Sequence, residues 1–348
     1  MSRSVSQAVT PHLRRERIPK EVWYQEPEKG PPRGPGVSRM RMRFGVLAVL
    51  LAVLGACRSS GEDARRAAES ARREGIRHYK AGDYALAEAA FTEELKHDPA
   101  SSDASIRRGG CRMKLGDLPG AEADFAESIR KLTRFEPDPH ALLALVQIER
   151  GNPRAALEGL DAALQQGAGD VHLLITRARA RMLTGDAKGA LSDVESAKSP
   201  DPKSAPAWAL HGMYLAASGR ESEAIAQLEK AAALAPEDPW AALWLLALGR
   251  GDALLQQARP VKPWQQQLVK FALGTLSWEA LQEEARRPSI ERERADRISD
   301  AHTTAGLVAE GRGQPAEASR HYRAVVEAGL THTNMHTWAT SRLSRLQQ

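Results

Sequence analysis

Residues 205–238 read APAWALHGMYLAASGRESEAIAQLEKAAALAPED, and this stretch decides the fold of the chain. Apolar side chains recur at helical spacing in its first half and again in its second half, which predicts two amphipathic helices. Gly219 lies between them, where it can adopt the left-handed conformation that ends a helix, and Pro236 closes the unit because proline cannot continue a helix. A helix pair of this size cannot bury its own apolar stripes, so it must stack on copies of itself.

Two small residues mark the crossing of these helices. Gly212 lies in the first half of the unit and Ala224 lies in the second half. A bulky side chain at such a crossing would overpack it, at a cost of about 1–3 kcal/mol. The sequence therefore predicts that the two backbones approach each other closely at Gly212.

The same pattern recurs along the chain with a period of 34 residues. The further copies lie at 68–101, 102–135, 137–170, 171–204 and 299–332. Each has a glycine followed by a polar residue between its two halves, as in Gly116-Asp117. This pattern resembles the tetratricopeptide repeat (TPR), a helix–turn–helix unit of about 34 residues. The resemblance implies an all-α fold, a right-handed superhelical solenoid of stacked helix pairs, with five tandem repeats over 68–238.

Residues 1–39 show no sustained apolar periodicity and are rich in Arg, Pro, Glu and Gly, a composition typical of disordered segments. They are either a disordered extension or sequence upstream of the true start, with Met40 or Met42 as the initiator. A basic arm that binds nucleic acid is the less favoured alternative.

A short apolar run follows, and it has the features of a secretory signal. Arg41 and Arg43 form a basic region, and the run 44–54 is apolar but too short to span a membrane. The four residues at its end, which resemble a bacterial lipobox, are Leu54, Gly55, Ala56 and Cys57. The resemblance implies that the signal peptide 40–56 is removed, that Cys57 carries acyl chains, and that 57–67 tether the repeats to a membrane. An ordinary signal peptide and a buried apolar helix are the alternatives.

The residue after this cysteine bears on the location of the protein. In bacterial lipoproteins an Asp directly after the modified cysteine often retains the protein at the inner membrane, whereas this chain has Arg58. The resemblance therefore implies a lipid-anchored protein of the bacterial cell envelope, at the outer membrane and facing the periplasm.

The positive charge of the chain lies in the leading segment. The whole chain carries +5, and residues 1–56 contain ten Arg or Lys and four Glu, so the remainder carries −1. This removes the electrostatic case for nucleic acid as a partner. Cys111 is the one cysteine after Cys57, so no disulfide can form within the processed chain, and we interpret Cys111 as a packing residue.

The first helices of the repeats are expected to line a concave groove that binds extended or helical segments of partner proteins. The candidate groove residues are Arg72, Tyr79, Arg107, Met113, Leu145, Ile148, Arg179, Met182 and Met213. On this register the groove is basic at its amino-terminal end and apolar at its carboxyl-terminal end, where methionine side chains can adapt to a partner. The alternative is that the arginines are solvated surface residues and the methionines fill the core.

Residues 239–298 break the repeat pattern and contain four of the seven tryptophans. The expected elements are a shortened repeat at 239–258, helices near 264–273 and 277–286, and a final repeat with a capping helix at 334–346 within 299–348. The tryptophans either pack inside the solenoid or form a partner or homodimer surface. Residues 263–281 and 301–346 loosely resemble NlpI-like bacterial lipoproteins, a family of envelope adaptors that are often dimeric.

No motif for catalysis or cofactor binding is present, because the chain has no phosphate-binding glycine loop, no HExxH and no paired CxxC. His332 and His336 could share a helix face, but two histidines without a third ligand are a weak metal signal. We therefore expect no enzyme activity, no cofactor and no metal site. An enzyme domain within 239–298 is the alternative.

Together these patterns predict a lipid-anchored periplasmic scaffold or adaptor that binds partner proteins and assists the assembly or regulation of cell-envelope machinery. Two other functions fit the same repeats. One is a pilotin-like lipoprotein for a secretin or pilus system, and the other is a cytoplasmic TPR co-chaperone.

Overall fold

The structure, a computed structural model, describes the backbone of residues 44–167, 169–198, 202–330 and 333–346, and side chains from residue 61 onward. All regular secondary structure in these ranges is helical, so the predicted all-α fold is confirmed. The predictions for residues 1–39, and for the side chains of the lipobox and Cys57, lie outside the described residues. The chain divides into two units, Met1–Ala56 and Cys57–Gln348, and the second unit carries the repeats.

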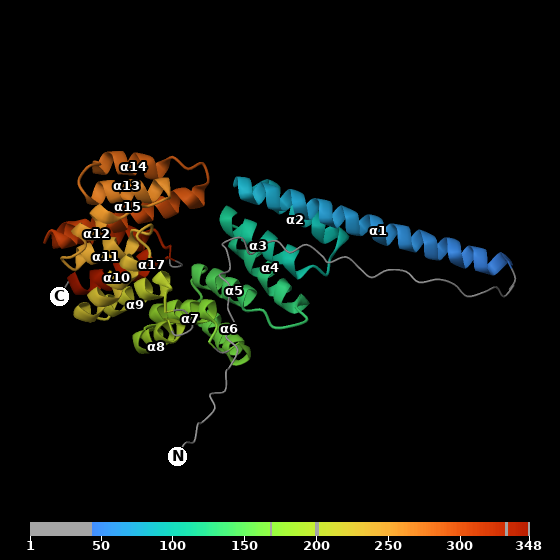
Figure 1. Cartoon of the computed structure of the whole chain (residues 1–348), viewed down its shortest axis with the longest axis horizontal. Helices are drawn as coiled ribbons and strands as arrows, with labels where there is room; N and C mark the ends of the chain where they lie inside the picture. The colour runs from blue at the N-terminus through green and yellow to red at the C-terminus, as the bar shows by residue number, and fades with distance from the viewer. Residues whose placement is uncertain (1–43, 168, 199–201, 331–332, 347–348) are drawn as a thin grey trace, which may run out of the picture. The chain divides into compact units, whose positions relative to one another are not determined.

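Five helix pairs follow one another from α1 to α10 (Figure 1). The first helices of these pairs are α1 (Phe44–Ala81), α3 (Ser102–Leu115), α5 (Pro137–Glu149), α7 (Val171–Thr184) and α9 (Ala205–Ala217). The second helices are α2 (Tyr84–His97), α4 (Leu118–Lys131), α6 (Pro153–Gln166), α8 (Ala187–Lys198) and α10 (Glu221–Leu234). The pairs from α3–α4 to α9–α10 each fall inside one of the 34-residue copies, so the sequence period matches the structural unit. The first pair differs, because α1 begins at Phe44 and continues through 57–67, the predicted tether, into the first copy.

The two helices of a pair meet at a small residue, which is a glycine in the first, second and fifth pairs, as the sequence predicts for Gly212. A Cβ atom on Gly212 would lie 2.6 Å from Cγ of Leu228 and 3.0 Å from the carbonyl oxygen of Ala224. A Cβ atom on Gly75, at the same place in the first repeat, would lie 2.6 Å from the Phe91 ring. Because real Cβ atoms do not come so close, only glycine allows the helices to pack at this distance.

The turn between the helices of a pair also follows the prediction. Gly219 has a φ of 83°, in the left-handed region that glycine adopts without steric strain. The next N–H, that of Arg220, donates to the carbonyl oxygen of Leu215 at 2.9 Å. This bond satisfies one of the free carbonyls at the end of α9 and closes the helix.

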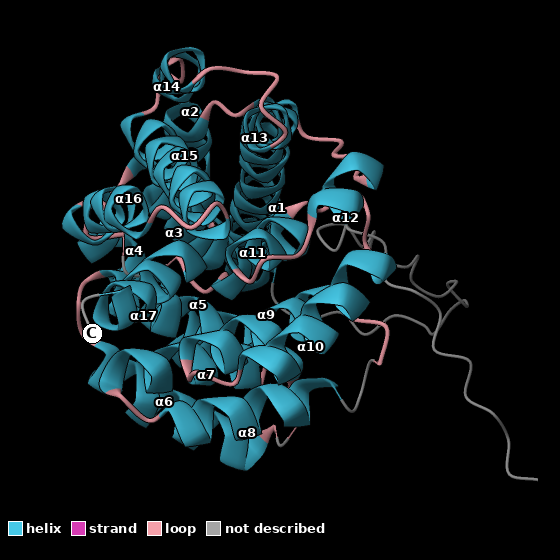
Figure 2. Cartoon of the chain, turned by 90° about the vertical axis from the view of Figure 1, so that its left-hand side faces the viewer, coloured by secondary structure: helices cyan, strands magenta, loops and turns pink. Residues whose placement is uncertain are grey.

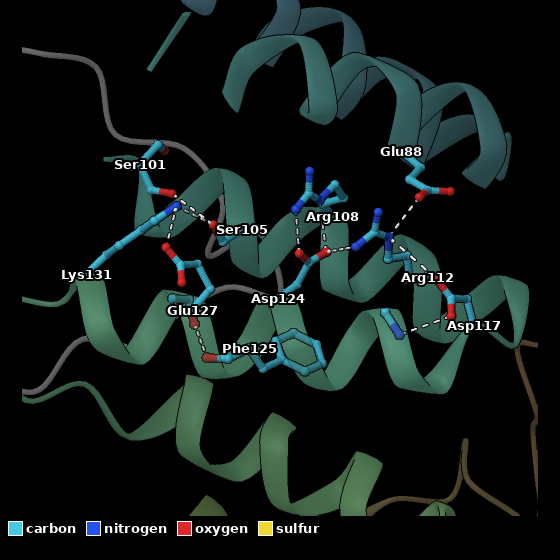
Figure 3. Close-up of polar contacts among 12 residues, drawn as sticks. Glu88, Ser101, Ser105, Arg108, Arg112, Asp117, Asp124, Phe125, Glu127 and Lys131 are labelled. Carbon is cyan, nitrogen blue, oxygen red and sulfur yellow. Dashed lines mark hydrogen bonds and ion pairs between the residues drawn. The ribbon is translucent and has the colours of Figure 1, made fainter. Parts of the chain in front are cut away.

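Arginine–carboxylate contacts join consecutive repeats (Figure 3). Asp124 on α4 is buried and accepts from Nε of Arg108 at 2.9 Å and from Nη1 of Arg112 at 3.0 Å, both on α3. Arg112 also donates from Nε to Glu88 on α2 at 2.8 Å, so it connects the first repeat to the second. Hydrogen bonds from two guanidinium groups offset the desolvation cost of burying this carboxylate.

The same contacts recur in the fourth repeat. Asp193 on α8 is buried, accepts from Nε of Arg177 at 2.9 Å and lies 2.7 Å from Nη1 of Arg181. Arg177 also donates to Asp161 on α6 at 2.8 Å, which connects the third repeat to the fourth. Ion pairs therefore add to apolar packing at the contacts between consecutive helix pairs.

The helices after the array are α11 (Trp240–Ala247), α12 (Asp252–Gln257), α13 (Pro263–Ala272), α14 (Trp278–Arg286), α15 (Glu291–Gly311), α16 (Pro315–Glu327) and α17 (Asn334–Leu346). Trp244 is buried and stacks on Trp338 of α17, with ring centroids 6.3 Å apart. Trp264 and Trp278 are half-buried and pack against the same core. These contacts favour the packing interpretation of the Trp-rich segment, and the homodimer stays a prediction.

The last helix does more than cap the end of the solenoid. Besides α16, α17 contacts α7 and α9, the first helices of the fourth and fifth repeats. Figure 2 shows α17 on one side of α7, and α6 and α8 on the other side. Further along, α15 contacts α3. The carboxyl-terminal helices therefore return to the side of the array that is formed by its first helices, which we call the first-helix face.

Candidate protein-binding surface

All nine residues that were predicted to line the groove lie on first helices of the array, from α1 to α9. The structure does not bring them together as one open surface. Their accessibility differs along the array, because the carboxyl-terminal helices cover part of the first-helix face. The open part determines where a partner can bind.

For two of the nine residues the predicted place in the groove is wrong. Ile148 and Met213 are each 0% exposed and belong to the hydrophobic core, so neither can contact a partner. Adjacent positions on a helix are separated by about 100° of rotation. A residue near the border of a helix face therefore points into the contact between helices when the assigned register is off by one position.

The carboxyl-terminal part of the first-helix face is covered by α17. Arg179 on α7 donates from Nη2 to Oδ1 of Asn334 at 3.1 Å. Met182, one turn further along α7, packs against the hydrophobic core. Both residues were predicted to contact a partner protein, but they pack against the chain itself. The alternative for the methionines, that they fill the core, describes Met182 and Met213.

Polar side chains of three further α17 residues hold this helix in position. The Ser341 hydroxyl donates to the carbonyl oxygen of Ala217 at 2.8 Å, and the Arg345 guanidinium lies 3.0 Å from Glu221 on α10. Arg342 is buried and lies between Glu221, at 2.9 Å, and Glu310 on α15. Burial alone would raise the pKa of Glu221, but its bonds to Arg342 and Arg345 outweigh that effect and lower it.

A second contact lies near the middle of the array. Arg292 at the start of α15 donates from Nη2 to Oε2 of Glu149 on α5 at 2.8 Å. The two side chains are 12% and 9% exposed, so the pair is largely shielded from water. Leu145, one turn before Glu149 on α5, is half-buried. The start of α15 is therefore anchored to the third repeat.

The amino-terminal part of the first-helix face is the more accessible part. The side chain of Arg72 is 40% exposed and donates from Nε to Glu94 at 2.7 Å. Tyr79 is 38% exposed and stands edge-on to Tyr84, with ring centroids 5.3 Å apart. Met113 on α3 is half-buried and also packs against the hydrophobic core, as Met182 does. These side chains present an aromatic ring, a guanidinium and the exposed part of a thioether to a partner.

Arg107 is the remaining candidate, and it is less accessible. Its side chain is 11% exposed and lies 2.8 Å from Asp103, one turn earlier on α3. Burial lowers the pKa of Arg107, and the nearby charges of Asp103 and Glu94 act in the opposite direction. Arg107 therefore offers little accessible surface to a partner, and its role is to pair with Asp103 beside the exposed residues.

Glu94 on α2 is a residue that the sequence reasoning missed. It is 0% exposed, and burial raises its pKa while the bond from Arg72 acts against the rise. A signal for it exists in the repeat register. The corresponding position holds small residues in the next four copies, namely Ser128, Ala163, Ala197 and Ala231. A carboxylate at a small-residue position indicates a local polar cluster instead of apolar packing.

These observations define a repeat protein built of stacked helix pairs, with an accessible amino-terminal face and a covered carboxyl-terminal one. Residues 72–137 match the family model described as tetratricopeptide repeat. Within 72–137 this match agrees with the resemblance that the 34-residue period indicates. No curated protein matches the chain.

Several solved structures are similar to this chain. YrrB, described as a TPR protein with an unusual peptide-binding site, is 20% identical, with a TM-score of 0.38 over 48% of this chain and 86% of YrrB. A thermophilic TPR protein of Thermus thermophilus is 23% identical, with a TM-score of 0.43 over 49% of this chain and 93% of its own. A tetratricopeptide repeat protein of Parabacteroides merdae is 14% identical, with a TM-score of 0.48 over 81% of this chain and 100% of its own.

Two further kinds of site are absent from the part of the chain that the structure describes. None of the helices described is both long enough and apolar enough to cross a membrane. Among the same residues, no group of three or more His, Cys, Asp or Glu side chains is arranged to hold a metal ion.

Proposed function

We propose that this chain is a lipid-anchored adaptor of the bacterial cell envelope that binds extended or helical segments of partner proteins. The proposal places the binding surface at the amino-terminal part of the first-helix face, around Arg72, Tyr79 and Met113. The observation that carries it is the contrast in accessibility. The carboxyl-terminal part of this face is covered by α17, whereas Tyr79 is 38% exposed.

The chemistry of the accessible surface indicates what a partner segment would offer. Tyr79 and Met113 provide apolar contacts, and methionine adapts to side chains of varied shape. The half-exposed guanidinium of Arg72 can bind a partner carboxylate in addition to Glu94. We therefore expect a segment that combines apolar side chains with an acidic one, bound along the first helices of the first two repeats.

A photocrosslinking experiment in intact cells tests the surface. A photoreactive phenylalanine analogue replaces Tyr79 in one variant and Met182 in a matched control, which was also predicted to line the groove. We expect a crosslinked partner from position 79 and none from position 182, because α17 covers α7. Crosslinks of equal yield from both positions, or from position 182 alone, contradict the proposed surface.

The membrane anchor is tested separately. If Cys57 carries acyl chains, cells given labelled palmitate incorporate label into the wild-type chain and not into the Cys57→Ala variant. The variant should also move from the detergent phase to the aqueous phase. Equal partitioning of both proteins without label on either contradicts the anchor, and leaves the protein-binding surface to be judged by the crosslinking result.

The identity of the crosslinked partner separates the remaining alternatives. Cell-wall hydrolases or envelope proteases support the adaptor, and a secretin supports the pilotin-like function. A cytoplasmic chaperone as the partner, together with an absent lipid label, supports the co-chaperone. The resemblance to NlpI-like lipoproteins stays a prediction that the same experiment addresses.

A further inference from the structure

A cleft of about 590 Å³ lies beside the last helix pair, away from the surface proposed above. Its walls are α14 and α16, its floor is α15, and Phe271 of α13 lies at its edge. The cleft is open to solvent.

Two histidines from different helices meet at this cleft. His302 lies on α15 and His321 on α16, and their Nδ1 atoms are 3.1 Å apart. The ring of Trp278 stands edge-on to both imidazoles, with centroid distances of 5.0 Å to His302 and 4.8 Å to His321. The helix packing therefore holds two nitrogen atoms side by side at the wall of an open cleft.

Both imidazoles are neutral at pH 7. Burial lowers the pKa of His302, and the charge of Arg286 adds to the effect. Burial, together with His302, lowers the pKa of His321 to about 4, against an opposing effect of Glu317. Without a proton on at least one Nδ1 the pair could not form a hydrogen bond, so one ring donates from Nδ1 and the other accepts.

We propose that His302 and His321 bind one divalent transition-metal ion, such as Zn²⁺, Ni²⁺ or Cu²⁺, through their Nδ1 atoms. Two imidazole nitrogens on one such ion, each at about 2.0–2.1 Å and at coordination angles of about 90–109°, lie about 2.9–3.4 Å apart. The observed separation of 3.1 Å falls within this range. The two helices already hold the ligand atoms at the distance that a metal ion requires.

The remaining coordination positions face the open cleft. Water from the cleft would complete the coordination of the ion, because His302 and His321 both line this open space. Glu317 also lines the cleft, one helical turn before His321, on the same face of α16. A rotamer change of Glu317 would supply a third ligand, which also accounts for a carboxylate at this place.

Metal binding at this pair requires a defined proton movement. The proton that bridges the two Nδ1 atoms transfers to Nε2 of the same ring, so both rings stay neutral and both Nδ1 lone pairs become available. No net proton is released at neutral pH. As the pH falls through the lowered pKa values of the pair, about 4 for His321, the rings gain protons and binding weakens.

The two other groups that the sequence singles out do not provide an equivalent site among the described residues. Cys111 is buried, and burial raises the pKa of its thiol to about 12, so it supplies no thiolate at neutral pH. His332 and His336 are four residues apart, and His332 lies outside the described residues. His336 therefore serves as the matched control for the proposed pair.

Calorimetric titration of the full chain with NiCl₂ and with ZnCl₂ tests the site. We expect one equivalent of metal to bind to the wild type and to His336→Gln with the same affinity. In His302→Gln and in His321→Gln the affinity should fall by at least about tenfold, since even changes to groups that only support a metal ligand cost a site about 10–100-fold. Absence of binding in the wild type, or binding that both histidine variants retain, overturns the proposal.

Trp278 supplies a second readout, which a purely structural histidine pair would not affect. Cu²⁺ bound at the pair lies beside the indole and quenches its fluorescence, so titration of the wild type should give a saturable decrease in emission. In Trp278→Phe the decrease should be lost while one equivalent of Cu²⁺ still binds by calorimetry. Quenching of equal amplitude in this variant places the ion elsewhere and contradicts the site.

The pH dependence completes the test. The charged groups around the pair are Glu279 on α14, Arg286 at the end of α14, Arg312 at the end of α15, and Glu317 and Arg320 on α16. The affinity for Ni²⁺ should be nearly constant from pH 8 to about pH 6.5 and should decrease as the pH falls towards the pKa of His321, about 4. A decrease centred on the ordinary histidine pKa of about 6.5 would place the ion on exposed histidines and contradict the proposed site. This proposal is independent of the partner-binding surface and stands or falls without it.

Discussion

The two ends of the first-helix face differ, although the same repeat builds both. At the amino-terminal end, Tyr79 and Arg72 are partly exposed on α1. At the carboxyl-terminal end, α17 covers α7 and α9, and its Trp338 is 0% exposed. The comparison teaches that a tandem repeat sets the shape of a face but not its availability, because a helix from outside the repeats can occupy it.

Removing the largest side chain of α17 should give the largest effect. Trp338→Ala leaves a cavity beside Trp244, and we expect the free energy of unfolding to fall by about 3–5 kcal/mol. Tyr79→Ala at the open end is the control and should cost less, about 1 kcal/mol, because it removes the edge-on contact with Tyr84 and leaves no closed cavity. Urea denaturation followed by circular dichroism measures both. Equal losses in the two variants would mean that both ends of the face are packed alike.

Breaking the ion pair that holds α17 should give a somewhat smaller effect. Arg342→Met leaves the Glu310 side chain, 8% exposed, without its arginine, and we expect a loss of about 3 kcal/mol. Arg130→Met is the control, because the Arg130 side chain is 73% exposed and pairs with Glu127 on the surface. Its removal should cost at most about 1 kcal/mol, as for other exposed pairs.

The same denaturation series checks this difference. A cost for Arg342→Met no larger than that of the control would show that α17 rests on the array loosely. The covered end would then resemble the open one, and a partner could displace the helix.

A fall in pH should lower the stability of the carboxyl-terminal helices, because His302 on α15 and His321 on α16 are half-buried there in neutral form. The pKa of His321 is about 4 in the folded chain and near the ordinary value of about 6.5 in the unfolded chain. Its contribution to the free energy of unfolding is therefore fully present above about pH 6.5 and is lost as the pH falls towards 4. His302 acts in the same direction. We expect the melting temperature of the wild type to fall more between pH 7 and pH 4.5 than that of His321→Gln.

The comparison between variants is needed because another group opposes this effect. Burial raises the pKa of Asp300 to about 7, against the hydrogen bond from Trp264, so Asp300 favours the folded state more as the pH falls. Both proteins contain Asp300, and its contribution cancels in their difference. Identical melting profiles for wild type and His321→Gln would show that the histidine pair is not shielded from water.

The local structure of the repeats follows from the sequence because its causes are local. A glycine in the left-handed turn and a small residue at the helix crossing belong to the repeated pattern, and Gly219 and Gly212 are found in those places. The capping helix expected at 334–346 coincides with α17, Asn334–Leu346. Helical periodicity and turn residues determine such features within a few positions of each residue.

The candidate surface was harder to predict, because accessibility depends on distant parts of the chain. Nothing near Arg179 indicates that Asn334, 155 residues later, will bond to it. The histidine pair has the same character, since His302 and His321 belong to no spacing motif and meet only when α15 and α16 pack together. Ile148 and Met213 were misplaced for a different reason, a small error in the angle around the helix.

The return of α17 has a consequence for how the chain matures. In a simple repeat array each unit contacts only its neighbours, so the pairs can form one after another as they leave the ribosome or a translocation channel. Here the bonds of Arg342 to Glu221 and of Ser341 to Ala217 bridge 121 and 124 residues. The fourth and fifth repeats keep an incomplete surface until the final thirteen-residue helix has been delivered, so a chain truncated before that helix would present this surface to chaperones and proteases.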